Sequence, residues 1–79
     1  MRLLLSVPTG VLVDAHVLKV TAESDRGSFT LLPRHADAAL ELVPGLLSYV
    51  SEEGEEVFVA VDEGVLVKAG DDVRVACRR

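Results

Sequence analysis

The amino-acid sequence predicts an all-β domain, a sandwich or barrel of short strands, and three observations lead to this class. Of 79 residues, 49% are hydrophobic, and 14 Val and 12 Leu supply most of them. Valine favours strands because its branched Cβ suits a pleated surface. Apolar and polar residues alternate over short segments, and turn residues interrupt these segments about every 8 to 12 positions. A chain of this length forms one domain, residues 1–79.

The first half of the chain shows short alternating segments separated by turns. In one of them Leu18, Val20 and Ala22 share an apolar face, as expected for a half-buried strand. Residues 36–43 include helix formers, but Pro44 leaves room for only about two helical turns, so a turn and a short strand are expected. The other strands expected in this half cover residues 2–7, 11–13, 16–23 and 28–32.

The second half of the chain begins with a hairpin. Strands over 45–51 and 55–62 flank a turn at Gly54, where glycine supplies a positive φ. In the second arm Phe58 and Ala60 fall on the outer face, which is therefore expected to be partly covered. Two further strands are expected over residues 65–68 and 73–78.

Charge and cysteine usage exclude several classes of function. A net charge of −5 and a pI of about 4.8 repel phosphate backbones, so no nucleic-acid partner is expected. Cys77 is the single cysteine, which excludes a disulfide within the chain, and its alternating context predicts a small core residue. The uncharged stretch 3–13 has 11 residues and contains Pro8 and Gly10, so neither a signal peptide nor direct membrane insertion is expected.

No catalytic or metal-binding pattern is visible in the sequence. His16, His35 and Cys77 lack the spacing of a metal site, and neither a GxSxG motif nor a glycine-rich phosphate loop occurs. Enzyme activity, a metal and a cofactor are therefore not expected. The apolar residues exceed what one buried face per strand requires, and such a surplus indicates a protein–protein surface.

The segment from Gly27 to Gly45 places a turn, residues 32–35, between two apolar runs. A metal or catalytic histidine, a plain loop and a docking surface are three interpretations of this turn. No partner residues support chemistry at His35, for which a hydrogen bond within the turn is the simplest role. Pro33 restricts φ and stiffens the turn. The favoured interpretation is a rigid loop at the rim of the sandwich that is offered to a partner.

The same segment carries a family resemblance. GSFTLLPRHA at 27–36, followed by LVPG at 42–45, resembles the epsilon subunit of F-type rotary ATP synthases, in which Pro-x-His-Ala precedes Leu-x-Pro-Gly. EGVLV at 63–67 and DVRV at 72–75 are similar to later strands of that family. The resemblance runs almost end to end, so it does not depend on a single motif.

The resemblance implies a fold, a function and a location. The fold would be a flattened β-sandwich of about ten short strands, without the family's C-terminal helical hairpin. The function would be that of a non-catalytic rotor subunit of the central stalk, which links gamma to the membrane c-ring and couples ion transport to ATP synthesis or hydrolysis. Its location would be the cytoplasmic face of the cell membrane, as a peripheral part of the complex. A free-standing small-ligand-binding β-sandwich and an acidic adaptor domain are the alternatives.

The resemblance also implies two sets of interface residues. The positions that match the family's c-ring-facing loop are Ser28, Arg34 and His35. The positions that match its gamma-facing side are Val7, Ala36, Ala38 and Ala39.

Two positions depart from the mainstream family pattern. The family often has an acid where Ser28 stands and usually glycine where Arg34 stands, so the local charge is reversed. Arg34 together with Asp37 is similar to the alternate F-type ATPases of bacteria and archaea, whose coupling ion is a proton or sodium. Because the chain ends directly after its last predicted strand, we expect a truncated N-terminal domain rather than a naturally short protein.

Overall fold

The computed structural model of the protein describes residues 1–78, which form eight β-strands and no helix. This confirms the predicted all-β class, with eight strands where about ten were expected. Arg79, the last residue of the expected domain, lies outside the described residues. In chain order the strands are β1 (Arg2–Val7), β2 (Gly10–Ser24), β3 (Gly27–Leu31), β4 (Ala38–Leu42), β5 (Gly45–Ser51), β6 (Glu56–Val61), β7 (Gly64–Ala69) and β8 (Asp72–Cys77).

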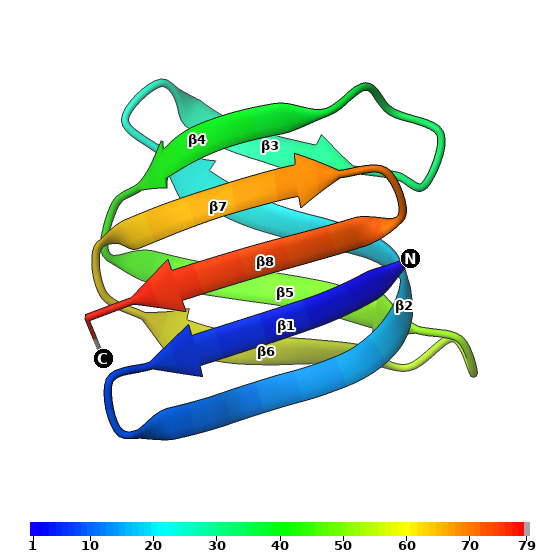
Figure 1. Cartoon of the computed structure of the whole chain (residues 1–79), viewed down its shortest axis with the longest axis horizontal. Coiled ribbons are helices and arrows are strands. Elements are labelled where there is room, and N and C mark those ends of the chain that lie inside the picture. The colour runs from blue at the N-terminus through cyan, green and yellow to red at the C-terminus, as the bar shows by residue number, and fades with distance from the viewer. Residues whose placement is uncertain (79) are drawn as a thin grey trace.

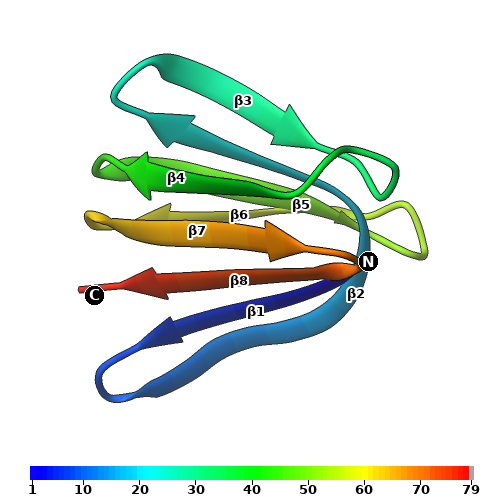
Figure 2. The ribbon, with the colours of Figure 1, turned by 45° about the horizontal axis from the view of Figure 1, so that its top comes forward.

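The strands pack as two layers of a sandwich (Figure 1). The front layer contains β4, β7, β8 and β1, in that order, together with the first part of β2. The back layer contains β3, the second part of β2, β5 and β6. Turning the molecule shows β3 along one rim, with a loop at each of its ends (Figure 2). Among the described strands only β1 and β8 pair in parallel.

β2 is one continuous strand of 15 residues, where two strands over 11–13 and 16–23 were expected. Its first part pairs with β1 and its second part with β3 and β5, so it belongs to both layers. The chain does not turn at Asp14, because this residue pairs with Leu4 and its carboxylate accepts two hydrogen bonds from the Arg2 guanidinium, both at 3.0 Å.

The prediction that Leu18 shares a buried face with Val20 and Ala22 is wrong. Leu18 is 48% exposed, whereas Val17, Val20 and Ala22 are buried. The register of β2 against β5 shifts between Val17 and Lys19. Such a bulge inserts one unpaired residue, bends the strand and reverses the side-chain alternation. The bulge lies where β2 passes from the front layer to the back layer.

The core fills the space between the layers, and most strands contribute one face to it. Cys77 is buried there, as predicted, and burial raises the pKa of its thiol, with a smaller contribution from the negative charge of Asp62. Gly54 has the expected positive φ, 87°. Phe58 is 61% exposed, so the described residues do not provide the expected cover for the outer face of β6. The large apolar side chains that are fully buried are Leu3, Leu5, Val17, Val20, Leu47, Leu66, Val73 and Val75.

Candidate protein interaction surfaces

The loop of residues 32–37 joins β3 to β4 and contains the Pro-Arg-His turn. The His35 backbone N–H donates to the oxygen of Leu32 at 3.0 Å, and the Leu32 N–H donates to Nδ1 of His35 at 3.3 Å. Because Nδ1 accepts this bond, the neutral imidazole carries its proton on Nε2. His35 therefore closes its own turn, as the simplest interpretation of the sequence predicted. All side chains of the loop are exposed.

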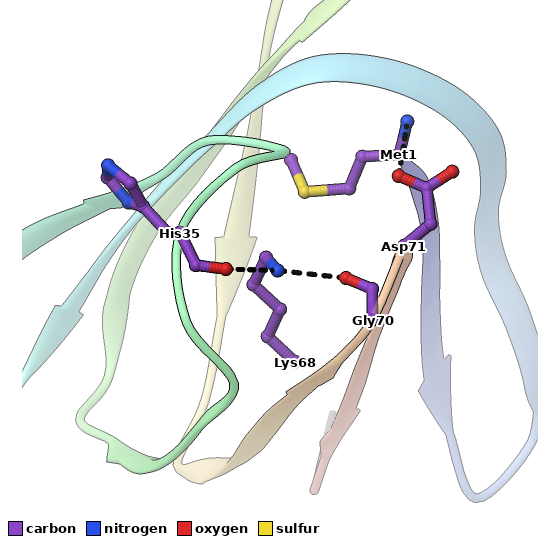
Figure 3. Close-up of polar contacts among 5 residues, drawn as sticks. All are labelled: Met1, His35, Lys68, Gly70 and Asp71. Carbon is purple, nitrogen blue, oxygen red and sulfur yellow. Dashed lines mark hydrogen bonds and ion pairs between the residues drawn. The ribbon is translucent and has the colours of Figure 1, made fainter.

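A buried lysine connects this loop to the front layer. Lys68 lies on β7 and is only 1% exposed. Its ammonium donates to the backbone oxygens of His35 and Gly70, each at 2.8 Å, and it lies between the two in Figure 3. A buried ammonium is costly unless hydrogen-bond acceptors surround it. The two carbonyl oxygens supply such acceptors, one from the loop and one from the turn between β7 and β8.

Further polar contacts join the same turn to its neighbours. The Gly70 N–H donates to Oδ1 of Asp37 at 2.8 Å, which gives the loop a second connection to the turn. The Asp71 backbone oxygen accepts from the Arg2 N–H at 2.8 Å, and the Asp71 carboxylate pairs with the amino group of Met1 at 3.4 Å (Figure 3). The loop, the β7–β8 turn and the start of β1 are thus tied together at one end of the sandwich.

The predicted c-ring-facing residues do not form one loop. Arg34 and His35 lie in the loop after β3, but Ser28 lies near the start of β3, opposite Glu23 of β2. An extended strand rises about 3.3 Å per residue, so Ser28 and Leu32 are roughly 13 Å apart. All three side chains are exposed. All three lie along the edge of the molecule that β3 forms with the turn before it and the loop after it (Figure 2). We call residues 25–35 the β3 rim.

The predicted gamma-facing residues are also divided. Ala36 lies in the loop, and Ala38 and Ala39 begin β4. Ala38 pairs with Lys68, and the row continues across the front layer through Val73 of β8 to Leu3 of β1. Val7 lies at the other end of β1, so it is distant from Ala38 both along the strands and across them.

An apolar area covers the outer face of the front layer, from the start of β4 toward the end of β1 that carries Val7. The register gives one row of Ala39, Val67, Arg74 and Leu4, and a second row of Val65, Ala76 and Ser6. Val65 is 50% exposed and Val67 is 44% exposed. We call this area the front strip. Its members are Leu4, Ser6, Ala39, Val65, Val67, Arg74 and Ala76.

Sequence reasoning missed Lys68 and the front strip. The alternation that buries Leu66 also points Lys68 into the core and turns Val65 and Val67 outward, so the signal was present in the period of β7. The charge of lysine argues against burial, and only the carbonyl oxygens of two other segments make it acceptable.

The described part of the chain offers little for small-molecule chemistry. Its larger hollows, of about 380 and 390 Å³, are open rather than enclosed: one lies between the β2–β3 turn and β4, and the other lies on the outer face of the front layer. No group of three or more His, Cys, Asp or Glu side chains in residues 1–78 is placed to hold a metal ion. None of these residues belongs to a helix with the length and apolar character needed to cross a bilayer.

Known proteins resemble this chain along almost its whole length. Residues 1–79 match the family model described as "ATP synthase, Delta/Epsilon chain, beta-sandwich domain". The ATP synthase epsilon chain 2 of Paraburkholderia xenovorans (strain LB400) is 42% identical over 80 residues, which cover 99% of this chain and 58% of that protein. The ATP synthase epsilon chain of Sulfurovum sp. (strain NBC37-1) is 35% identical over 77 residues, which cover 98% of this chain and 59% of that protein. The chain thus spans less than two thirds of the length of these relatives.

Solved structures show the same fold at low identity. A chain in the cryo-EM structure of the Euglena gracilis mitochondrial ATP synthase (OSCP/F1/c-ring) has a TM-score of 0.91 and 20% identity, with 98% of this chain and 49% of that chain covered. A chain of the Tetrahymena thermophila mitochondrial ATP synthase (central stalk/c-ring) has a TM-score of 0.82 and 16% identity, with 100% and 63% covered. The chain therefore belongs to the ATP synthase Delta/Epsilon family, and its residues form the β-sandwich domain of an epsilon subunit.

Proposed function

We propose that the protein is a non-catalytic rotor subunit of the central stalk that links gamma to the c-ring. Membership of the epsilon family supports this role, because its relatives are named as chains of ATP synthase. The observation that carries the proposal is the meeting of two exposed surfaces at one corner. The front strip and the β3 rim lie on different sides of the sandwich, and the loop of residues 32–37 connects them: residues 32–35 belong to the rim, and the loop leads into β4, which carries Ala39 of the strip.

Gamma binds the front strip in this proposal, including Ala39, together with the flanking residues Val7, Ala36 and Ala38. Exposed valines on a flat sheet supply the apolar centre that a stable interface needs. Arg74 lies among them and offers a cation to an acidic residue of the partner.

The c-ring contacts the β3 rim, through Ser28, Arg34 and His35. Arg34 gives the rim a positive charge at one end, and Asp25 and Arg26 lie at the other. The polar loops of a c-ring are then recognised mainly by hydrogen bonds and charge. Such contacts set specificity and the rate of association more than affinity.

The mechanism is mechanical. A close-packed core resists compression and transmits strain, so the sandwich transfers rotation between the c-ring and gamma without chemistry, metal or cofactor of its own. The complex works at the cytoplasmic face of the membrane and couples proton or sodium transport to ATP synthesis or hydrolysis, with the ion selected by another subunit.

Two variants separate the two interfaces, and each serves as a control for the other. The double variant Val65→Ser and Val67→Ser should weaken binding to gamma by about tenfold and leave binding to isolated c-ring unchanged. Arg34→Ala should weaken binding to the c-ring and spare gamma. The Kd of each variant is measured by surface plasmon resonance, with gamma or the isolated c-ring from the same organism immobilised on the sensor surface.

A third variant guards against nonspecific effects. Leu46→Ser replaces an apolar side chain that is 54% exposed on the back layer, outside both surfaces. It should bind both partners normally. If the valine variant binds gamma as tightly as Leu46→Ser does, the front strip is not the gamma interface.

A further inference from the structure

We infer that Lys68 is a positioning residue that holds the loop of residues 32–37 in its binding conformation before the partner arrives. The identity of the partner rests on the proposed function, but the effect of Lys68 on the loop does not. The inference starts from a buried cation whose hydrogen bonds both go to backbone oxygens outside its own strand ladder.

The loop has few other connections to the sandwich. It forms no strand pairs, and its side chains are exposed. Its two internal hydrogen bonds, between Leu32 and His35, close the turn but do not attach it. Within residues 1–78, hydrogen bonds attach the loop to the body at two points, Lys68 to His35 and Gly70 to Asp37.

Of these two connections, the one from Lys68 is buried and charged. A hydrogen bond from an ammonium is about twice as strong as one between neutral groups, and Lys68 is shielded from water whereas the Asp37 side chain is exposed. A side chain needed only to fill this space would be apolar, since a buried ammonium is costly. Lys68 therefore serves the loop rather than the core.

The consequence for binding is a smaller ordering cost. The Lys68 bond fixes the backbone of His35 (Figure 3), and this restricts the backbone of the neighbouring residue Arg34. A loop that is already in its bound conformation loses less entropy on association. When only a fraction of molecules hold the competent conformation, the apparent Kd is the intrinsic Kd divided by that fraction, so a tenfold smaller fraction raises the apparent Kd about tenfold.

Amide hydrogen exchange in the native chain tests the inference. In Lys68→Met, which keeps the length of the side chain and removes the ammonium, the amides of Leu32, His35 and Gly70 should lose protection by about tenfold or more. The amides of Ser51 and Gly54, which are bonded within the β5–β6 hairpin, are controls in a part of the fold that Lys68 does not contact. Lys68→Arg keeps the positive charge and the donors and should restore most of the protection.

Two results would overturn the inference. One is an equal loss of protection at the loop and hairpin amides, which means that Lys68 acts on global stability alone. The other is a loop that keeps its protection in Lys68→Met.

Asp37→Ala provides a second test if Lys68→Met does not fold. This exposed substitution removes the connection to Gly70 and leaves Lys68 in place. Leu32 and His35 should then keep most of their protection while Gly70 loses its own. If all three amides become unprotected, Asp37 and not Lys68 holds the loop, and the inference fails.

Binding to c-ring separates this inference from the proposed function. The Kd of Lys68→Met should rise by about tenfold, mainly through slower association. If Arg34→Ala binds normally while Lys68→Met frees the loop, the proposed c-ring interface fails and the role of Lys68 stands. If Lys68→Met loses affinity with an unchanged loop, the positioning role fails.

Discussion

The ammonium of Lys68 lies 2.8 Å from the backbone oxygen of His35, although 33 positions separate the two residues in the chain. This contact joins a core strand to the loop that carries the family's Pro-x-His motif. It also places the junction of the two proposed interfaces directly above a buried charge. The stiffness of that corner therefore depends on polar bonds as well as on apolar packing.

Gly64 should not tolerate a methyl group. A Cβ added there would lie 2.9 Å from Cα of Cys77 and closer still to the backbone oxygen of Ala76, so the β7–β8 ladder must shift. Gly64→Ala should lower the free energy of unfolding by about 1–3 kcal/mol, the range for overpacking. Urea denaturation of the variant and the parent measures it.

Gly45→Ala is the matched control for this change. Its Cβ would meet the end of the Glu23 side chain, which can move away, rather than fixed backbone. A change within about 0.5 kcal/mol is expected. Equal losses in the two glycine variants would contradict the explanation from backbone crowding.

Val17 and Leu18 should respond in opposite ways to truncation, because the bulge buries the first and exposes the second. Val17→Ala should cost about 1–3 kcal/mol of stability, and Leu18→Ala less than about 0.5 kcal/mol. Thermal unfolding followed by circular dichroism distinguishes them. If the alternation of the sequence continued without a bulge, Leu18→Ala would instead cost more stability than Val17→Ala.

The Arg2–Asp14 pair should make stability depend on pH in the acid range. The hydrogen bond and the positive charge of Arg2 lower the pKa of Asp14 below its ordinary value, with a further contribution from His16. A carboxyl group with a lower pKa in the folded state stabilises the fold above its unfolded pKa, and this contribution is lost as pH falls through the folded value. The Tm difference between the parent and Asp14→Asn should therefore be largest near neutral pH and vanish in acid.

Salt provides the control for this pair. Both side chains are about half exposed, so the difference near neutral pH should be small and should shrink further in concentrated sodium chloride. A Tm difference that persists in acid or in high salt would show that Asn disturbs β2 by another route.

Cys77 should be unreactive in the folded protein. Burial raises the pKa of its thiol, and the thiolate is the nucleophile, so both access and ionisation are limited. Alkylation by iodoacetamide at neutral pH should be at least about 100-fold slower than in guanidinium, as measured by mass spectrometry. Rapid labelling of the native chain would mean that β8 opens locally.

The features that the sequence predicts correctly are local ones. The all-β class, the hairpin at Gly54 and the burial of Cys77 depend on alternation and turn chemistry within a few residues. The continuity of β2 through Asp14 does not, because it depends on Arg2 and the strand ladder with β1. The bulge at Leu18 is equally invisible in the pattern, since it follows from passage between layers.

The interface residues show the same limit. Ser28 and Arg34 are close in sequence and were expected in one loop, but the extended β3 strand puts them at opposite ends of the rim. Conversely, Ala39, Val67 and Leu4 are distant in sequence and share one face, because β4, β7, β8 and β1 are neighbours. Which residues form a surface is decided by strand order, and strand order is not encoded in any single segment.

The position of β8 has a consequence for how the protein is made. β8 lies between β1 and β7, and Arg2 pairs with Asp72, so the first and last described strands are neighbours at the centre of the front layer. Contacts between such distant residues raise the contact order and slow folding. A nascent chain on the ribosome that has not yet released β8 presents two unpaired strand edges, on β1 and on β7. Such edges are prone to aggregation. The nascent domain is therefore expected to remain prone to aggregation with neighbouring nascent chains until β8 pairs with both strands.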